Sequence, residues 1–249
     1  MMKRGVIRFL LGLTVIALIG VLLFSFFSMK GAARYVIQPN RTRVVVKNSG
    51  DQEFLSKEDV LRVLPIDTTD TTVMAVNLSA VEKEIRAEIP YAKEVNAYIS
   101  PTFHQMTVQV QSRRPLLRYY NSQGSFYLDD EGHPMRTKSG VSAYLPVVKV
   151  NQVDSVTLHD VLFPLALFLE EHEEWSTFFS MIELTDENRL HFYPRVGDYV
   201  FQVLGTANLE NDLKKIPIFY NKIVPQVGAN RYRLVKLSYE GQIVCKKRG

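Results

Sequence analysis

The stretch that decides the fold is Val81–Tyr120, which reads VEKEIRAEIPYAKEVNAYISPTFHQMTVQVQSRRPLLRYY. In its first part, apolar residues recur three and four positions apart up to Pro90, a spacing typical of an amphipathic helix that ends at a proline. In Lys93–Ser100 and Met106–Gln111 the spacing changes to two, which predicts half-buried β-strands. The connection Pro101–Gln105 is short enough for a hairpin. The stretch therefore predicts a helix followed by an antiparallel pair of strands.

Two further elements precede this stretch. Val44–Val46 is a short apolar run that ends in turn residues, which predicts a strand. Ser56 followed by Asp59 is a capping-box pattern at the start of a helix, and Ser79 followed by Glu82 repeats the pattern at the next helix. The order strand–helix–helix–strand–strand predicts a small α+β domain over residues 42–113, with two helices on one face of its sheet.

The remaining residues, 114–249, alternate short apolar runs with turn residues and predict a mainly antiparallel β domain with two helices. The first helix has apolar residues at helical spacing over Leu158–Leu169, where Pro164 kinks the helix or delays its start. The second runs from about Asn208 to Ile223. The expected strands are Leu117–Tyr120, Ser125–Leu128, Leu145–Val150, Met181–Leu184, Leu190–Tyr193, Tyr199–Leu204 and a terminal strand Val235–Val244, in which Gly241 marks a bulge or tight turn.

The N-terminal run Phe9–Phe27 contains 19 residues without a charge. As a helix it would span roughly 28 Å, close to the roughly 30 Å of a bilayer's hydrocarbon core. We therefore expect a short cytoplasmic N-terminus at residues 1–8, a single transmembrane helix at 9–28 and a linker at 29–41. A cleaved signal peptide is the alternative, because basic residues precede the run. Basic residues flank both sides, so the expected N-in orientation depends on the length of the downstream chain.

Composition narrows the classes of function. The chain has 249 residues, with 30 basic and 26 acidic ones in a mixed pattern, which disfavours nucleic-acid binding. Cys245 is the only cysteine, so an internal disulfide and a zinc site built from cysteine pairs are excluded. The five histidines are scattered, and none of the nucleophile-elbow, nucleotide-binding or zinc-protease motifs occurs. We expect no catalytic residues, no cofactor, no metal and no small-molecule substrate.

The segment Phe126–Met135, FYLDDEGHPM, contains three acids and a histidine within ten residues. It fails as a calcium loop, because a loop that starts at Asp129 would have His133 and Pro134 where an oxygen ligand and a glycine are required. Adjacent carboxylates in a solvated turn also point apart, so an acid–base pair is not favoured. Asp129 and Gly132 instead predict a structural turn between two strands.

The order of these elements, together with several local motifs, resembles the bacterial cell-division family FtsQ/DivIB. The matching positions are Pro90-Tyr91, Arg113 and Pro115 of an E-R-x-P-like motif with Ser112 in the acidic place, Asp129 and Gly132, the helix in VLGTANLENDLKKI, and Leu237 and Tyr239 of a D-L-R-Y-like motif with Lys236 in the acidic place. The resemblance implies that the domain over residues 42–113 is POTRA-like and that residues 114–249 are the family's β domain.

The same resemblance implies a non-catalytic divisome scaffold in the inner membrane at the division septum, with most of the chain periplasmic. Its expected partners are FtsB/FtsL-like proteins and, through them, septal peptidoglycan synthases. Binding is expected by β-strand addition at the C-terminal strand, since an edge strand leaves backbone N–H and C=O groups unpaired. The expected binding residues are Leu237, Ser238, Tyr239, Gly241 and Ile243.

Other interpretations stay open at this point. The C-terminal strand would bind no partner if it simply completes the sheet and its aromatic residues belong to the core. A membrane-anchored cell-wall enzyme outside the cytoplasm, or another POTRA-type adaptor in envelope biogenesis, are the alternatives to the scaffold.

Overall fold

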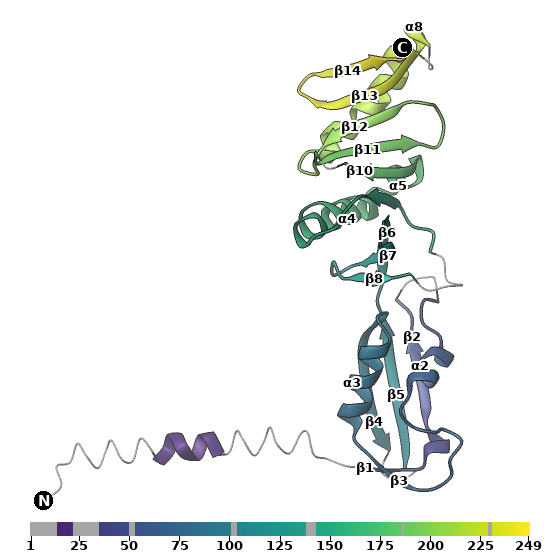
Figure 1. The fold of residues 1–249 in the computed structure, drawn as a ribbon, viewed down its shortest axis with the longest axis vertical. Helices are drawn as coiled ribbons and strands as arrows, with labels where there is room; N and C mark the ends of the chain where they lie inside the picture. Colours follow the sequence, from purple (N-terminus) through teal and green to yellow (C-terminus); the bar gives the residue numbers. More distant parts are fainter. Residues whose placement is uncertain are drawn as a thin grey trace, which may run out of the picture. The chain divides into compact units, whose positions relative to one another are not determined.

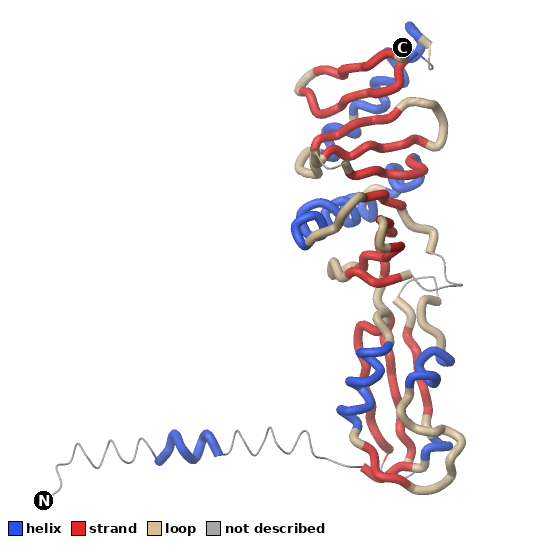
Figure 2. Tube along the Cα trace, viewed as in Figure 1, coloured by secondary structure: helices blue, strands red, loops and turns tan. Residues whose placement is uncertain are grey.

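The computed structural model describes residues 14–21, 35–49, 53–100, 104–137, 143–185, 187–228 and 231–249. The chain forms two compact units, residues 1–112 and 113–249, which we call unit 1 and unit 2. Figure 1 labels their elements, and Figure 2 shows the same view by secondary structure. The structure is α+β, with many more strands than long helices.

The predicted fold class included a transmembrane helix, and this part of the prediction is corrected by the structure. Within the described ranges, no helix is long and apolar enough to cross a membrane. The prediction of a spanning helix at 9–28 is therefore wrong for this part of the chain, and residues 9–13 and 22–28 lie outside the described residues.

Unit 1 is built on a three-stranded sheet in the order β2 (Arg43–Lys47), β5 (Gln105–Ser112) and β4 (Ala92–Ser100). The antiparallel pair β4–β5 is the hairpin that the alternation of apolar residues predicted, with Val95 opposite Val110. Strand β2 runs parallel to β5. Alternate side chains of β5 are fully buried, which explains the strict period of two in its sequence.

Two helices complete this arrangement, α2 (Lys57–Val63) beside β2 and α3 (Leu78–Glu88) along β4 (Figure 1). The capping box at Ser56 and Asp59 is confirmed. The Ser56 hydroxyl accepts from the Asp59 N–H, and the Asp59 carboxylate accepts from the Ser56 backbone N–H. The predicted cap at Ser79 is wrong, because α3 begins earlier and Asn77 accepts from the Ala80 N–H.

Short elements at one end of unit 1 escaped the sequence analysis. Strands β1 (Tyr35–Ile37) and β3 (Met74–Val76) form a two-stranded antiparallel sheet, and η1 (Pro39–Arg41) is a single 3₁₀ turn. Three-residue strands are too short to show a hydrophobic period, so no pattern predicted them.

Unit 2 contains one nine-stranded sheet in the order β14-β13-β12-β11-β10-β9-β6-β7-β8. The pairs β6–β9, β9–β10 and β12–β13 are parallel and the others antiparallel, so the sheet is mixed. The strands are β6 (Pro115–Asn121), β7 (Gly124–Asp129), β8 (Pro134–Arg136), β9 (Val147–Val150), β10 (Phe179–Leu184), β11 (Arg189–Pro194), β12 (Val200–Leu204), β13 (Tyr232–Tyr239) and β14 (Gln242–Lys247).

The helical segments of unit 2 explain two of the parallel pairs, because parallel neighbours need a long crossover connection. The first crossover joins β9 to β10 through η2 (Thr157–Leu162), α4 (Phe163–Glu171) and α5 (Glu173–Phe178). The second joins β12 to β13 through α6 (Leu209–Leu213), α7 (Lys215–Ile218), η3 (Phe219–Ile223) and α8 (Val224–Val227). Pro164 stands at the start of α4, directly after a π-helical stretch, as its missing N–H requires.

One face of the sheet packs against these helices and forms the core of unit 2. Large side chains such as Phe192, Phe201 and Phe219 are fully buried there. The opposite face carries polar and partly exposed residues that alternate with the core residues along each strand. Figure 1 shows β10 to β14 following one another in this order up to the C-terminal hairpin.

Candidate partner-binding edge

The chain ends in a hairpin of β13 and β14, which we call the terminal hairpin. The predicted single strand Val235–Val244 is therefore interrupted, and the tight turn suggested at Gly241 is present with φ at +65°. Glycine adopts this left-handed conformation without the strain that a Cβ atom would add. The hairpin places β14 at the end of the sheet, where it pairs only with β13 among the described strands. One side of β14 is thus an open edge with unpaired backbone groups.

The structure distributes the five expected binding residues over different places. Leu237 is fully buried on β13 and belongs to the core. Ser238 and Tyr239 lie at the exposed end of β13, Gly241 lies in the turn, and Ile243 is the one residue of the five on the edge strand itself. The sequence pattern located the hairpin and did not reveal which of its two strands is the edge.

The side chains of β14 alternate between two environments. Ile243 and Cys245 are half-buried and pack against the core, whereas Val244 and Lys246 are exposed on the opposite face. Burial raises the pKa of the Cys245 thiol, so this thiol stays protonated and unreactive at neutral pH. Val244, Lys246 and Lys247 were missed, although the period of two would have placed Val244 and Lys246 on one face once the turn was known.

A polar cluster of Asp212, Lys215 and Ser238, which we call the Asp212 cluster, anchors the hairpin to the second crossover. The Lys215 ammonium lies 3.0 Å from Asp212 Oδ1 and donates to the backbone carbonyls of Leu237 and Tyr239, the latter at 3.0 Å. The Ser238 hydroxyl donates to Asp212 Oδ2. The ion pair is largely shielded, since the Lys215 and Asp212 side chains are 19% and 7% exposed.

The Asp212 cluster begins where the ladder between β12 and β13 ends. The last paired residues of these strands are Gln202 and Lys236. Beyond them, the Leu204 N–H donates to Ser238 Oγ at 2.8 Å. The Lys215 ammonium donates to the backbone carbonyls of Leu237 and Tyr239. These contacts satisfy backbone groups on the inner side of the hairpin, so at this end of the sheet the edge open to a further strand is β14.

Within the described ranges, a group of residues in the turn at Asp129 could hold a metal ion. Asp129, Glu131 and His133 each offer a ligand atom, and these atoms lie within 4.8 Å of one another. The Arg113 guanidinium lies among them, with Nη1 at 2.6 Å from Asp129 Oδ2 and 3.3 Å from Glu131 Oε2. A metal would have to displace this guanidinium, which already neutralises the fully buried Asp129 carboxylate.

The geometry of this turn fits a structural role. Asp129 Oδ1 accepts from the backbone N–H groups of Glu131 and His133 at 2.9 and 2.7 Å. Gly132 adopts a φ of +80° between β7 and β8, and its N–H donates to the Asp129 carbonyl at 3.1 Å. The aspartate therefore closes the turn, and Arg113 ties it to the start of unit 2.

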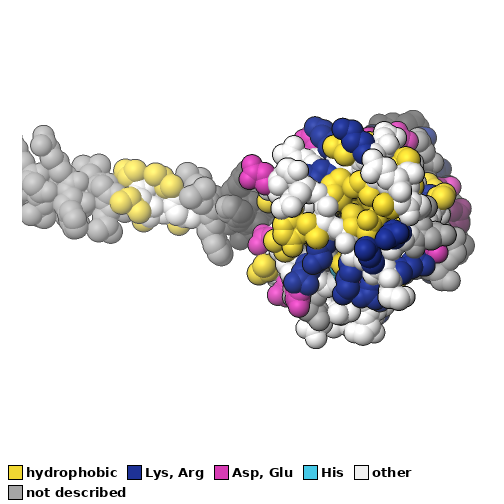
Figure 3. All heavy atoms as spheres, turned by 90° about the horizontal axis from the view of Figure 1, so that it is seen from above, with side chains coloured by type: hydrophobic (Ala, Val, Ile, Leu, Met, Phe, Trp, Pro, Cys, Tyr) yellow, Lys and Arg dark blue, Asp and Glu magenta, His cyan; other side chains and the backbone are white. Residues whose placement is uncertain are grey.

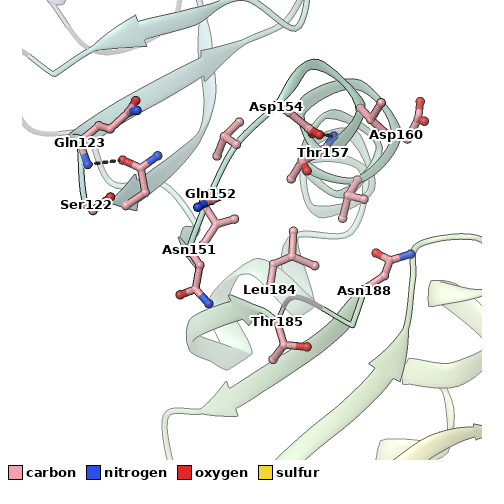
Figure 4. A pocket seen from close by; sticks show the side chains of 15 residues that line it. Ser122, Gln123, Asn151, Gln152, Asp154, Thr157, Asp160, Leu184, Thr185 and Asn188 are labelled. Atoms are coloured by element: carbon pink, nitrogen blue, oxygen red, sulfur yellow. Dashed lines mark hydrogen bonds between the residues drawn. The ribbon is translucent and has the colours of Figure 1, made fainter.

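A groove of about 960 Å³ opens in unit 2 where β9 and β10 end (Figure 4). Carboxamides such as Asn151 and Asn188 line it, and the ionisable residues among its described lining are Asp154 and Asp160. Asp154 accepts hydrogen bonds from Thr157, which lower its pKa. Among its described lining residues, no histidine, lysine or cysteine stands beside a hydroxyl, so the groove does not present an activated nucleophile.

The uncovered face of the sheet carries an ion pair between β9 and β10. Lys149 donates to Glu183 Oε1 at 2.8 Å, and the Tyr193 hydroxyl donates to Oε2 at 2.8 Å. The bond from Lys149, together with that from Tyr193, lowers the pKa of Glu183. Burial, reinforced by Glu183, raises the pKa of Tyr193 to about 12. These residues crosslink three strands.

The sequence of unit 2 matches a known family. Residues 114–246, more than half of the chain, match the family model FtsQ/DivIB, C-terminal related. The chain therefore belongs to this family of cell-division proteins, whose members are non-catalytic divisome scaffolds, and the resemblance seen in the sequence is confirmed. None of the curated proteins compared with the chain matches it.

Proposed function

We propose that this protein is a non-catalytic scaffold of the divisome that binds FtsB/FtsL-like partners at the division septum. The observation that carries the proposal is the open β14 edge at the end of a nine-stranded sheet, in a chain that belongs to a cell-division family. Through these partners the protein would help control septal peptidoglycan synthesis.

Strand addition explains how such an edge binds. An extended segment of the partner pairs its backbone with β14, and its alternate side chains meet those of the edge strand. In this proposal Ile243 contacts the partner directly, and Tyr239, 43% exposed, contacts it beside the turn at Gly241. Leu237 and Ser238 support the site from within, since one is in the core and the other is held by Asp212.

Unit 1 supports a further part of the proposal, namely that residues 42–113 form a POTRA-type domain. Its elements follow the order β2, α2, α3, β4 and β5 when the short strand β3 is set aside, and its sheet has β5 in the centre. We expect this domain to contact a different protein from the one bound at β14.

The test uses tagged protein in dividing cells and in pulldowns. The protein should gather at the septum, and its depletion should give undivided filaments. Even distribution around the envelope with normal division would exclude the scaffold function. Cross-linked pulldown with mass spectrometry should recover FtsB/FtsL-like proteins.

Tyr239→Lys should weaken this recovery, because it puts a charge beside the edge without removing the backbone carbonyl bound by Lys215. Val196→Lys is the matched control, since Val196 is 81% exposed on the loop between β11 and β12. Equal recovery with both variants would remove Tyr239 from the binding site.

A further inference from the structure

The terminal hairpin carries an unusual concentration of positive charge. Residues 231–248 contain six basic residues and one acidic residue, Glu240, whereas the whole chain has 30 basic and 26 acidic residues. Figure 3 looks onto this end of unit 2 and shows hydrophobic side chains in the middle, with Lys and Arg side chains around them. A partner that covers this surface must place apolar groups at its centre and negative charge at its rim.

The pattern along β14 is more specific than the net charge. Gln242 is polar, the next three residues, Ile243–Cys245, are apolar, and Lys246 and Lys247 are basic. Val244 is 37% exposed, and both lysines are exposed. Neither lysine has an ion-pair partner in the part of the chain that the structure describes. The edge therefore has an apolar section and a charged section, with the charge at the C-terminal end only.

The neighbouring strand strengthens this division. Lys236 stands opposite Val244 and Leu234 opposite Lys246, so the exposed face of the hairpin already contains alternating apolar and basic side chains. At the C-terminal end, the Arg248 N–H donates to the Arg231 carbonyl, which brings two more basic residues beside Lys247. Arg248 pairs with Asp198 at 3.5 Å, which leaves the two lysines as the uncompensated charges of β14.

We propose that the segment that adds to β14 is a strand with three consecutive apolar residues and a pair of acidic residues at one end. This inference rests on the proposed strand addition and names the chemistry of its partner. The apolar residues lie against Ile243–Cys245, and the acidic residues lie against Lys246 and Lys247. Because the charges occur at one end only, they fix the register and the direction of the added strand.

The physical reason is that backbone pairing alone does not choose a register. A shift by one residue along the edge exchanges the two faces of the added strand, and a shift by two separates the acidic residues from the lysines. Each exposed cross-strand ion pair contributes roughly 0.2–1 kcal/mol, and like charges directly opposite destabilise by a similar amount. Two such positions suffice to favour one register over its neighbours.

The experiment attaches the test strand to the full chain itself, because Gly249 lies two residues beyond the end of β14. A flexible Gly/Ser linker after Gly249 gives the strand a high effective concentration and lets it run antiparallel to β14. The first tail has two glutamates followed by three β-branched apolar residues, which puts the glutamates beside the lysines. The second tail has two lysines in place of the glutamates, and the third has the glutamates after the apolar residues.

The readout is amide hydrogen exchange at Gln242–Lys247, with exchange in β10 and β11 as the check that the fold is intact. The first tail should slow exchange at the edge about tenfold more than the lysine tail, as expected from two charge pairs gained and two repulsions avoided. In a chain with Lys246→Glu and Lys247→Glu, the order of the two tails should reverse.

Each other outcome overturns a stated part of the account. If all three tails slow exchange equally, β14 accepts a strand but its charges select nothing, and the inference fails while the proposed function stands. If no tail slows exchange although β10 and β11 stay protected, the edge does not accept a strand, and the proposed binding mode fails with it.

Discussion

Lys215→Met tests whether the Asp212 cluster holds the terminal hairpin in place. The substitution keeps the length of the side chain and removes the ammonium that binds Asp212 Oδ1 and the carbonyls of Leu237 and Tyr239. It leaves a carboxylate that is only 7% exposed without its counter-charge. Breaking a buried ion pair from one side costs about 3–5 kcal/mol. Because Lys215 is itself 19% exposed, we expect about 3 kcal/mol of lost unfolding free energy.

The adjacent lysine supplies the matched control. Lys214 forms an ion pair with Glu210 at 2.6 Å, but the two side chains are 64% and 56% exposed. Lys214→Met should therefore cost no more than about 0.5 kcal/mol. The assay is urea unfolding followed by the fluorescence of Trp175, the single tryptophan of the chain, which packs on Phe179 in unit 2.

Two results decide the interpretation. Adding Asp212→Asn to Lys215→Met should restore part of the loss, because the unpaired charge is then gone. Exchange of the β13 and β14 amides should also rise more than exchange in β10. If Lys215→Met costs as little as Lys214→Met, the Asp212 cluster does not anchor the hairpin, and the reasoning is refuted.

Three further predictions concern unit 2. Glu183→Gln should cost about 1 kcal/mol of unfolding free energy at neutral pH. Because its partner Lys149 lowers the pKa of Glu183, the advantage of the wild type should be complete at pH values above 4.5, the ordinary pKa of glutamate. In acid-unfolding curves, this advantage should vanish as the pH falls through the lowered pKa. Arg113→Met should cost about 3 kcal/mol in urea unfolding, because it strands the buried Asp129 carboxylate, and a loss below about 1 kcal/mol would contradict that role. Gly241→Ala should cost about 1–2 kcal/mol, since φ is +65° there, and an unchanged stability would show that the turn adapts.

Local patterns predicted much of unit 1. The change from helical spacing to alternation at Lys93 located α3 and the β4–β5 hairpin, because each period reflects which side chains one packed face can bury. The capping box at Ser56 was equally local. The cap at Ser79 was wrong because Asn77, two residues earlier, offers the same acceptor, and sequence alone does not rank two nearby caps.

Long-range arrangements were beyond the same reasoning. The two predicted helices of unit 2 are crossovers between parallel strands, and their presence between strand runs was the available signal for a mixed sheet. The Asp212 cluster brings Asp212 and Lys215 of the second crossover into contact with Ser238 of β13. No rule of sequence spacing predicts a contact between residues so far apart in the chain. The apolar run Phe9–Phe27 predicted a spanning helix from its length, and the described helix covers only residues 14–21.

The sequence predicted part of the local structure around the proposed site. The motif around Leu237 and Tyr239 lies in the terminal hairpin, and Gly241 indicated its turn. The edge strand can be identified only once the turn is known to divide the predicted strand into two. The unpaired backbone groups then belong to β14 and not to β13. In the proposed strand addition, Lys246 and Lys247 set the register, which their exposed positions alone did not suggest.

The central claim is that β14 pairs with a strand of another protein. The most direct test is residue-resolved hydrogen exchange of the full chain, free and bound to its FtsB/FtsL-like partners. The account predicts that new protection concentrates at Gln242–Lys247. Protection elsewhere, at β8 or around the groove where β9 and β10 end, with exchange at Gln242–Lys247 unchanged, would contradict it.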